Sequence, residues 1–246
     1  MRSKILLALY VGLFLVIYSW YVFKINLDVN DYSDIIVAIT FFFTLFSGYF
    51  IGRQNDRYTS IAEEISNTDG TFSLLYRISG AVPFVQNRVS EALIKHYRKI
   101  LDSNNWAYHI VNPSTTITDV FNAYNSAIGE DADKLGQFGD AFGGGFLQLQ
   151  ISRKRMIMLY HQRLLLLHWA LTYTLAGLMI VSFNFIPNHT LLINVLKIAF
   201  GLAVFFVILL LKQLDDLSIF GEDFSKNTAN DMLRIVEEKD VQEMGK

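Results

Sequence analysis

The sequence predicts an all-α membrane protein in which four transmembrane helices continue into a cytoplasmic helical layer. Hydrophobic residues make up 52% of the 246 residues, a fraction too high for a soluble domain of this length. Four stretches are long enough to cross the hydrocarbon core of a bilayer, which takes roughly 20 apolar residues in a helix. The polar segment between the second and third stretches repeats with the period of a helix, and strand-like alternation is weak throughout.

The four apolar stretches are 5–23, 35–52, about 164–186 and 191–211. The first follows Arg2 and Lys4 as a signal peptide would, but its apolar run is too long and no small-x-small cleavage site follows it. We therefore expect a retained span. The predicted parts are transmembrane helices 1 and 2 in 1–52, a cytoplasmic helical region in 53–160, transmembrane helices 3 and 4 in 161–211, and a cytoplasmic C-terminal helical segment in 212–246.

Basic residues flank the apolar stretches unevenly, and this asymmetry predicts the orientation. Those on the predicted cytoplasmic side are Arg2, Lys4, Arg53, Arg57, Arg153, Lys154, Arg155, Arg163 and Lys212. The opposite ends carry only Lys24 and Lys197, whose long side chains can snorkel towards lipid headgroups. Both termini and the middle segment should therefore be cytoplasmic, in a multi-pass protein of the cell inner membrane.

The middle segment should fold as helices. Val85, Val89, Leu93, Tyr97 and Leu101 recur every four residues and predict an amphipathic helix over 85–101. A second helix is expected over 112–129, with Ser114 or Thr115 as its N-cap and Gly129 as its stop. The Gly- and Asp-rich stretch 129–146 is the best candidate for a mobile loop. After it, 147–169 contains no helix breaker, so the third span should begin as a long helix below the bilayer.

Composition and motifs exclude most chemistry. There is no cysteine, hence no disulfide or thiolate site, and a net charge of −2 offers no surface for nucleic acid. The run FGGGF lacks the Gly-Lys-Ser/Thr of a phosphate loop and indicates a hinge instead. His161 and His168 are seven residues apart, whereas a two-histidine zinc clamp on a helix needs about four. We expect neither an enzyme nor a cofactor.

Four carboxylates gather after the fourth span. They are Asp215, Asp216, Glu222 and Asp223. Carboxylates this close repel one another unless a cation or basic side chains neutralise them, and hard oxygen ligands suit calcium. They are therefore weak candidates for a calcium site. The alternative, a solvated helix end paired with Arg or Lys from the middle segment, accounts for them more simply.

The second span carries two aromatic stripes. With 3.6 residues per turn, Phe41, Leu45 and Tyr49 share one stripe, and Phe42, Phe46 and Phe50 share the next. Packing against lipid or other spans explains such a pattern. The alternative is a hydrophobic constriction formed by several copies of this helix, with Arg53 and Arg57 drawing anions to its cytoplasmic mouth. That alternative requires a homo-oligomer.

The end of this span resembles the bestrophin family. Gly48, Tyr49 and Phe50 are followed by Arg57 and Tyr58, with the arginine nine positions after the glycine, as in the pore-lining helix of bestrophins. FGEDF at 220–224 resembles the start of the family's acidic segment. The pattern LLYRI…P…L…Y…L…W over 74–106 is similar to a bacterial bestrophin-like family of unknown function.

The resemblance implies a pentameric, chloride-conducting anion channel whose neck is lined by Phe41, Leu45 and Tyr49, with Tyr49 innermost. The chain departs from the family at two places. Phe224, Ser225 and Lys226 stand where animal bestrophins continue with carboxylates, which argues against a calcium clasp. No proline precedes the neck, so the register is open by one residue, and Phe42 and Phe46 remain alternative pore-lining residues.

The leading hypothesis is thus a passive, anion-preferring homo-oligomeric channel whose partners are its own copies, inorganic anions and the lipid bilayer. The alternative is a membrane-anchored sensor or scaffold, in which the spans only hold the cytoplasmic layer at the membrane. The amphipathic helix 85–101 would then cover a protein partner instead of a sister subunit.

Overall fold

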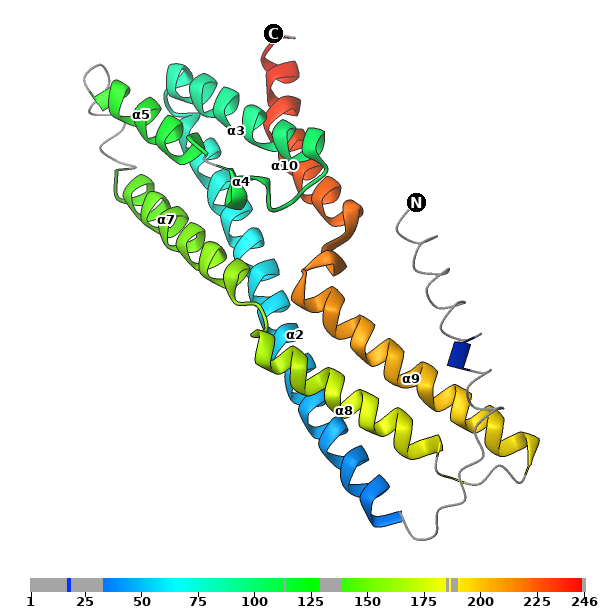
Figure 1. Cartoon of the computed structure of the whole chain (residues 1–246). Helices are drawn as coiled ribbons and strands as arrows, with labels where there is room; N and C mark the ends of the chain where they lie inside the picture. Colours follow the sequence, from blue (N-terminus) through cyan, green and yellow to red (C-terminus); the bar gives the residue numbers. More distant parts are fainter. Residues whose placement is uncertain are drawn as a thin grey trace. The chain divides into compact units, whose positions relative to one another are not determined.

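The computed structural model describes residues 17–18, 33–112, 114–128, 139–184, 186 and 190–244, without the side chains of 33, 127–128, 221–225 and 238–244. Within these ranges all regular secondary structure is helical, as predicted (Figure 1). The first predicted span, 5–23, lies outside the described residues except for Ile17 and Tyr18.

The described helices are α2 (Ser33–Ser79), α3 (Pro83–Ser103), α4 (Tyr108–Val111), α5 (Thr116–Ile128), α7 (Gly139–His161), α8 (Leu166–Asn184), α9 (Leu191–Asp215), the 3-10 helix η1 (Ser218–Phe220) and α10 (Gly221–Met244). They belong to two compact units. The first comprises Met1–Asn55 and Arg163–Asp216, and the second comprises Asp56–Gln162 and Leu217–Lys246. Helix α2 contributes residues to both.

Three described helices of the first unit are long and apolar enough to cross a membrane: the start of α2, α8 and α9. They correspond to the second, third and fourth predicted spans. A small cluster of Phe43, Ala176, Met179 and Val204 packs them together, while most of their apolar side chains stay exposed. Such exposure fits helices whose surroundings are lipid or further subunits.

Lys197 contacts a backbone carbonyl of its own chain. Its side chain is buried, and its ammonium group donates to the backbone carbonyl of Ile186, just beyond α8. A buried charge needs such partners because desolvation is costly. This lysine therefore ties the start of α9 to the end of α8.

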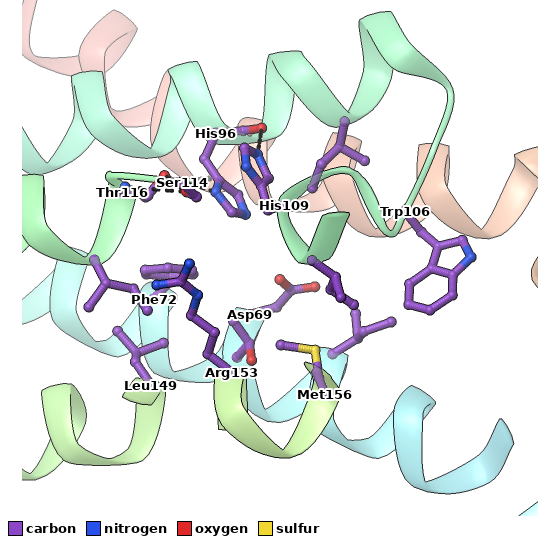
Figure 2. A pocket seen from close by; sticks show the side chains of 15 residues that line it. Asp69, Phe72, His96, Trp106, His109, Ser114, Thr116, Leu149, Arg153 and Met156 are labelled. Atoms are coloured by element: carbon purple, nitrogen blue, oxygen red, sulfur yellow. Dashed lines mark hydrogen bonds between the residues drawn. The ribbon is translucent and has the colours of Figure 1, made fainter. Parts of the chain in front are cut away.

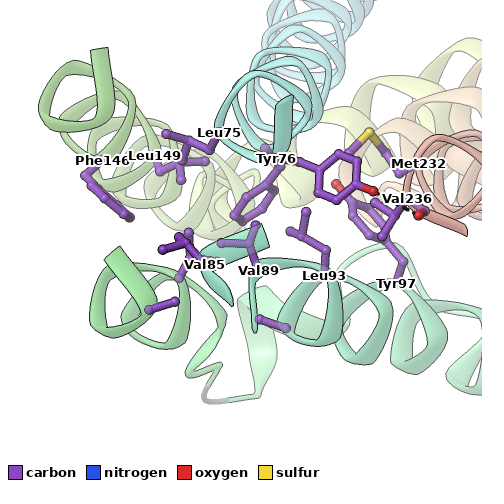
Figure 3. Packing of buried hydrophobic residues seen from close by; sticks show 14 of the residues in the cluster. Leu75, Tyr76, Val85, Val89, Leu93, Tyr97, Phe146, Leu149, Met232 and Val236 are labelled. Atoms are coloured by element: carbon purple, nitrogen blue, oxygen red, sulfur yellow. Dashed lines mark hydrogen bonds between the residues drawn. The ribbon is translucent and has the colours of Figure 1, made fainter. Parts of the chain in front are cut away.

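The second unit has a continuous hydrophobic core. The predicted face of α3 is confirmed: Val85, Val89, Leu93 and Tyr97 are all buried and meet side chains of α2, α7 and α10 (Figure 3). The Tyr76 hydroxyl donates to the Val236 carbonyl at 3.1 Å, so the polar atom of this buried ring is satisfied. Helix α3 also packs against α5.

Two expectations about α7 are wrong. Residues 139–146 of the expected mobile loop form the first turns of α7, whereas 129–138 lie outside the described residues. FGGGF is therefore no hinge. A Cβ added at Gly145 would lie 2.8 Å from Cδ2 of the buried Leu75, but one at Gly144 would meet nothing within 4 Å. Gly145 thus allows α7 to approach α2 closely.

The long uninterrupted helix expected before the third span is also absent. Helix α7 ends at His161 and α8 begins at Leu166, with 162–165 outside any helix. His161 and His168 consequently lie on different helices.

Candidate functional site

The predicted neck stripe lies on an open face of α2. The side chains of Phe41, Leu45 and Tyr49 are 59%, 50% and 62% exposed. Gly48 and Gly52 share this exposed face, and a Cβ added at either would meet nothing within 4 Å. The described part of the chain therefore leaves at least half of each of these three side chains exposed, and its packing does not require glycine at either position.

The neighbouring stripe turns inward along its length: Phe42 is 48% exposed, Phe46 is half-buried and Phe50 is buried. The rings of Phe42, Phe46 and Phe50 stack in sequence at 6.4 and 6.3 Å between centroids. Phe50 is only 3% exposed, and its ring lies 4.9 Å from the His168 ring of α8. Phe50 also packs in a cluster with Leu164 and Leu211. This stripe is thus partly used to hold α2 against its neighbours in the first unit.

Arg57 is not at a solvent-facing position. It is 5% exposed, and it donates from Nε to the Leu159 carbonyl at 2.6 Å and from Nη2 to the Tyr160 carbonyl at 2.7 Å. These carbonyls belong to the last turn of α7, where backbone acceptors lack intrahelical donors. A cation at a helix C-terminus also interacts favourably with the helix dipole. Arg57 therefore caps α7, whereas Arg53 is exposed.

Tyr58 joins the two motifs noted in the sequence. Its ring lies 4.4 Å from that of Phe220, the first residue of FGEDF, and the Trp106 ring lies 4.7 Å from Phe220. The three rings belong to a cluster built on Ile61 and Leu159. The arginine-aromatic pair after the second span thus has a packing role within the second unit.

Asp215 and Asp216, at the end of α9, are engaged by protein groups. The buried Asp215 accepts from the backbone N–H of Leu164 at 2.7 Å and from the indole N–H of Trp169 at 3.3 Å. Asp216 pairs with Arg163 at 3.6 Å. Among the described residues, no three His, Asp or Glu side chains form a group that could hold a metal ion. The Glu222 and Asp223 side chains lie outside the described residues.

Comparison with solved structures gives the fold a precedent. The chain matches a variant of a bacterial bestrophin homologue from Klebsiella pneumoniae, with one tryptophan replaced by alanine, at a TM-score of 0.66, 14% identity and 96% coverage of both chains. The chain has the bestrophin fold. It also matches a variant of a membrane protein, with one proline replaced by alanine, at a TM-score of 0.62, 12% identity and coverage of 96% of this chain and 100% of the other. No protein-family model and no curated protein matches the sequence.

The bestrophin-fold chain also contains a cavity of about 90 Å³ within its second unit (Figure 2). Asp69, His96, His109 and Arg153 are among the residues that line it. No local pattern in the sequence indicated this cavity, because its lining comes from five helices and no two of these four residues have the spacing of a known motif.

Proposed function

We propose that the protein is a homo-oligomeric ion channel, passive and anion-preferring, in which α2 of each subunit lines a hydrophobic neck. The open face of α2 carries the proposal. The described part of the chain leaves Phe41, Leu45 and Tyr49 at least half exposed, as expected of a stripe at a shared axis. The bestrophin fold supports it, since one of the matching structures is named as a bestrophin homologue.

The packing supports one of the two possible registers. Phe50 is buried and Phe46 packs beside it, so the Phe50 end of this stripe packs within the first unit, although Phe42 is 48% exposed. The stripe of Phe41, Leu45 and Tyr49 has no such commitment and is the one we assign to the neck. Stacked rings of apolar side chains in a narrow pore can gate by dewetting.

Arg53 is the cation that we place at the cytoplasmic mouth. It is exposed and stands one helical turn beyond Tyr49. Arg57 is assigned to the end of α7 because its Nε and Nη2 atoms donate to the backbone carbonyls of Leu159 and Tyr160. We further propose a pentamer that conducts chloride, in the inner membrane, with both chain termini in the cytoplasm.

The competing function, a scaffold that binds a protein partner through 85–101, loses its main support. The apolar face of α3 is buried within its own chain, where Val85, Val89 and Leu93 are fully covered. That face is not free to cover a partner.

Chloride flux in lipid vesicles tests the proposal. Vesicles containing the purified protein should release chloride faster than empty vesicles. The triple substitution of Phe41, Leu45 and Tyr49 by alanine should increase the flux or alter its selectivity, because a wider neck stays wet. Leu178→Ala, which truncates an exposed apolar side chain on α8, is the control and should behave as wild type. Chloride flux equal to that of empty vesicles, together with no effect of the triple substitution, would refute the proposed channel function.

Particle symmetry is an independent check. Negative-stain images of the purified protein should show rings with a central axis. Monomers or dimers would contradict a pore formed by several copies of α2.

A further inference from the structure

The cavity of the second unit is small and mostly apolar, with polar groups on three sides. The lining residues used below are Asp69, Phe72, His109, Leu149, Arg153 and Met156. Figure 2 shows Asp69 of α2, His109 of α4 and Arg153 of α7 entering the same space from three helices. None of these residues has a part in the proposed neck.

Asp69 presents a hydrogen-bond acceptor. One carboxylate oxygen, Oδ1, accepts from the Tyr97 hydroxyl at 2.6 Å, and no other hydrogen bond to this carboxylate occurs among the described residues. Burial raises the pKa of Asp69 to about 6, although the Tyr97 hydrogen bond acts in the opposite direction. At neutral pH the group is therefore mainly ionised, with Oδ2 available to a donor.

His109 presents a second acceptor. Its ring stacks on that of His96 at 3.8 Å between centroids, and its Nε2 donates to the His96 carbonyl at 2.9 Å. Burial lowers the pKa of both imidazoles, so His109 is neutral at pH 7 and its Nδ1 carries a lone pair. This Nδ1 is buried and has no hydrogen-bond partner among the described residues, which is costly unless a donor is supplied.

Arg153 supplies the positive charge. Its side chain is half-buried at the edge of the cavity, and it forms no ion pair with the described carboxylates. The planar guanidinium suits bidentate recognition of a carboxylate. The lining thus offers two acceptors, one of them anionic, and one cationic donor.

We propose that this cavity binds a small zwitterion, an α-amino acid with an apolar side chain. Its ammonium group would donate to Asp69 and to Nδ1 of His109, and its carboxylate would accept from Arg153. The apolar side chain would lie among Phe72, Leu149 and Met156. A monocarboxylate would leave both acceptors without donors, and its negative charge would be repelled by that of Asp69. A simple amine would leave Arg153 unpaired.

Size limits the ligand. A cavity needs about 10–15 Å³ to hold one water molecule. The cavity of about 90 Å³ therefore has room for the equivalent of several water molecules. Valine and leucine, with fewer than ten non-hydrogen atoms each, are in the right range. L-Leucine is the probe that we choose.

Calorimetric titration of the purified full-length protein tests the assignment. L-Leucine should bind saturably, and 4-methylpentanoate and isoamylamine, which lack the ammonium and the carboxylate respectively, should each bind roughly tenfold more weakly or worse, because each loses a charge-assisted contact. Asp69→Asn and Arg153→Gln should each weaken leucine binding by a similar factor. Lys154→Gln, an exposed neighbour on α7, is the matched control and should bind as wild type does.

Three results would overturn the proposal. They are no heat of leucine binding at millimolar concentration, equal binding by Arg153→Gln and wild type, and equal binding of 4-methylpentanoate and leucine. Fluorescence of Trp106, which lines the cavity, gives a second readout. Because Arg153 lies at the cavity edge, its variant keeps the test valid even if Asp69→Asn fails to fold.

Discussion

Replacing Arg57 with methionine should separate a structural arginine from a pore-mouth arginine. Methionine keeps an unbranched apolar stem at this buried position but removes every donor. Two charge-assisted hydrogen bonds, at 2.6 and 2.7 Å, are lost. The last turn of α7 then keeps its carbonyl dipoles without the cation that faces them.

The cost can be worked from these contacts. Hydrogen bonds to charged groups contribute roughly 1.5–3 kcal/mol each, which sets an upper range of about 3–6 kcal/mol for the pair. The Leu159 carbonyl keeps a second donor, the N–H of Gln162 at 3.1 Å, so the loss should fall at the low end, about 3 kcal/mol. For a chain of this size that is a fall of roughly 6–12 °C in melting temperature.

Thermal unfolding in detergent, followed by circular dichroism at 222 nm, measures the effect. Arg53→Met is the matched control: its side chain is exposed on the same helix, and its melting temperature should stay within about 2 °C of wild type. Anion flux in vesicles should respond in the opposite way: Arg53→Met should reduce the flux although its melting temperature is unchanged. Equal melting temperatures for Arg57→Met and wild type would refute the capping role.

Three further tests, all by thermal unfolding, probe other contacts. Asp215→Asn should lower the free energy of unfolding by about 1–3 kcal/mol, because the acceptor for Leu164 and Trp169 loses its charge. Asp216→Asn breaks a half-exposed ion pair and should cost less than about 1 kcal/mol. Equal losses for the two variants would contradict the buried role of Asp215. Gly144→Ala should stabilise α7 by about 0.5–1 kcal/mol, whereas Gly145→Ala should destabilise the protein because the added methyl group would clash with Leu75. If Gly145→Ala proved the more stable of the two variants, α7 and α2 would not be closely packed there. Asp69 has a pKa of about 6 in the folded protein against an ordinary 3.8, so its protonation stabilises the fold fully below about pH 4, and this stabilisation is lost as the pH rises to about 6. Asp69→Asn should therefore show a smaller fall in stability between pH 4 and pH 6 than wild type. An equal fall in both proteins would count against the raised pKa.

Local patterns in the sequence predicted much of the fold. The three described apolar helices and the buried face of α3 follow from hydrophobic length and period, which depend only on neighbouring residues. The resemblance of 48–58 and 220–224 to bestrophins pointed to the fold that the structural comparison bears out. The two aromatic stripes of α2 were also evident from spacing alone.

The roles of the polar residues depended on tertiary structure. Arg57 meets α7 across about a hundred residues of chain, so nothing near it in the sequence distinguished a helix cap from a pore mouth. The break at 162–165 contains no glycine or proline; it occurs where Arg57 caps one helix end and Asp215 accepts from the backbone of Leu164.

The same reason explains what was and was not predicted about the sites. The sequence by itself determined which residues are apolar, where the helices lie and which side chains share a face, because these properties are set within a few turns. Only the tertiary structure decided that the stripe of Phe41 is open while Phe50 is buried, and that Asp69, His109 and Arg153 line one cavity. Burial and charge pairing are set by contacts between distant segments, and a single local pattern does not encode them.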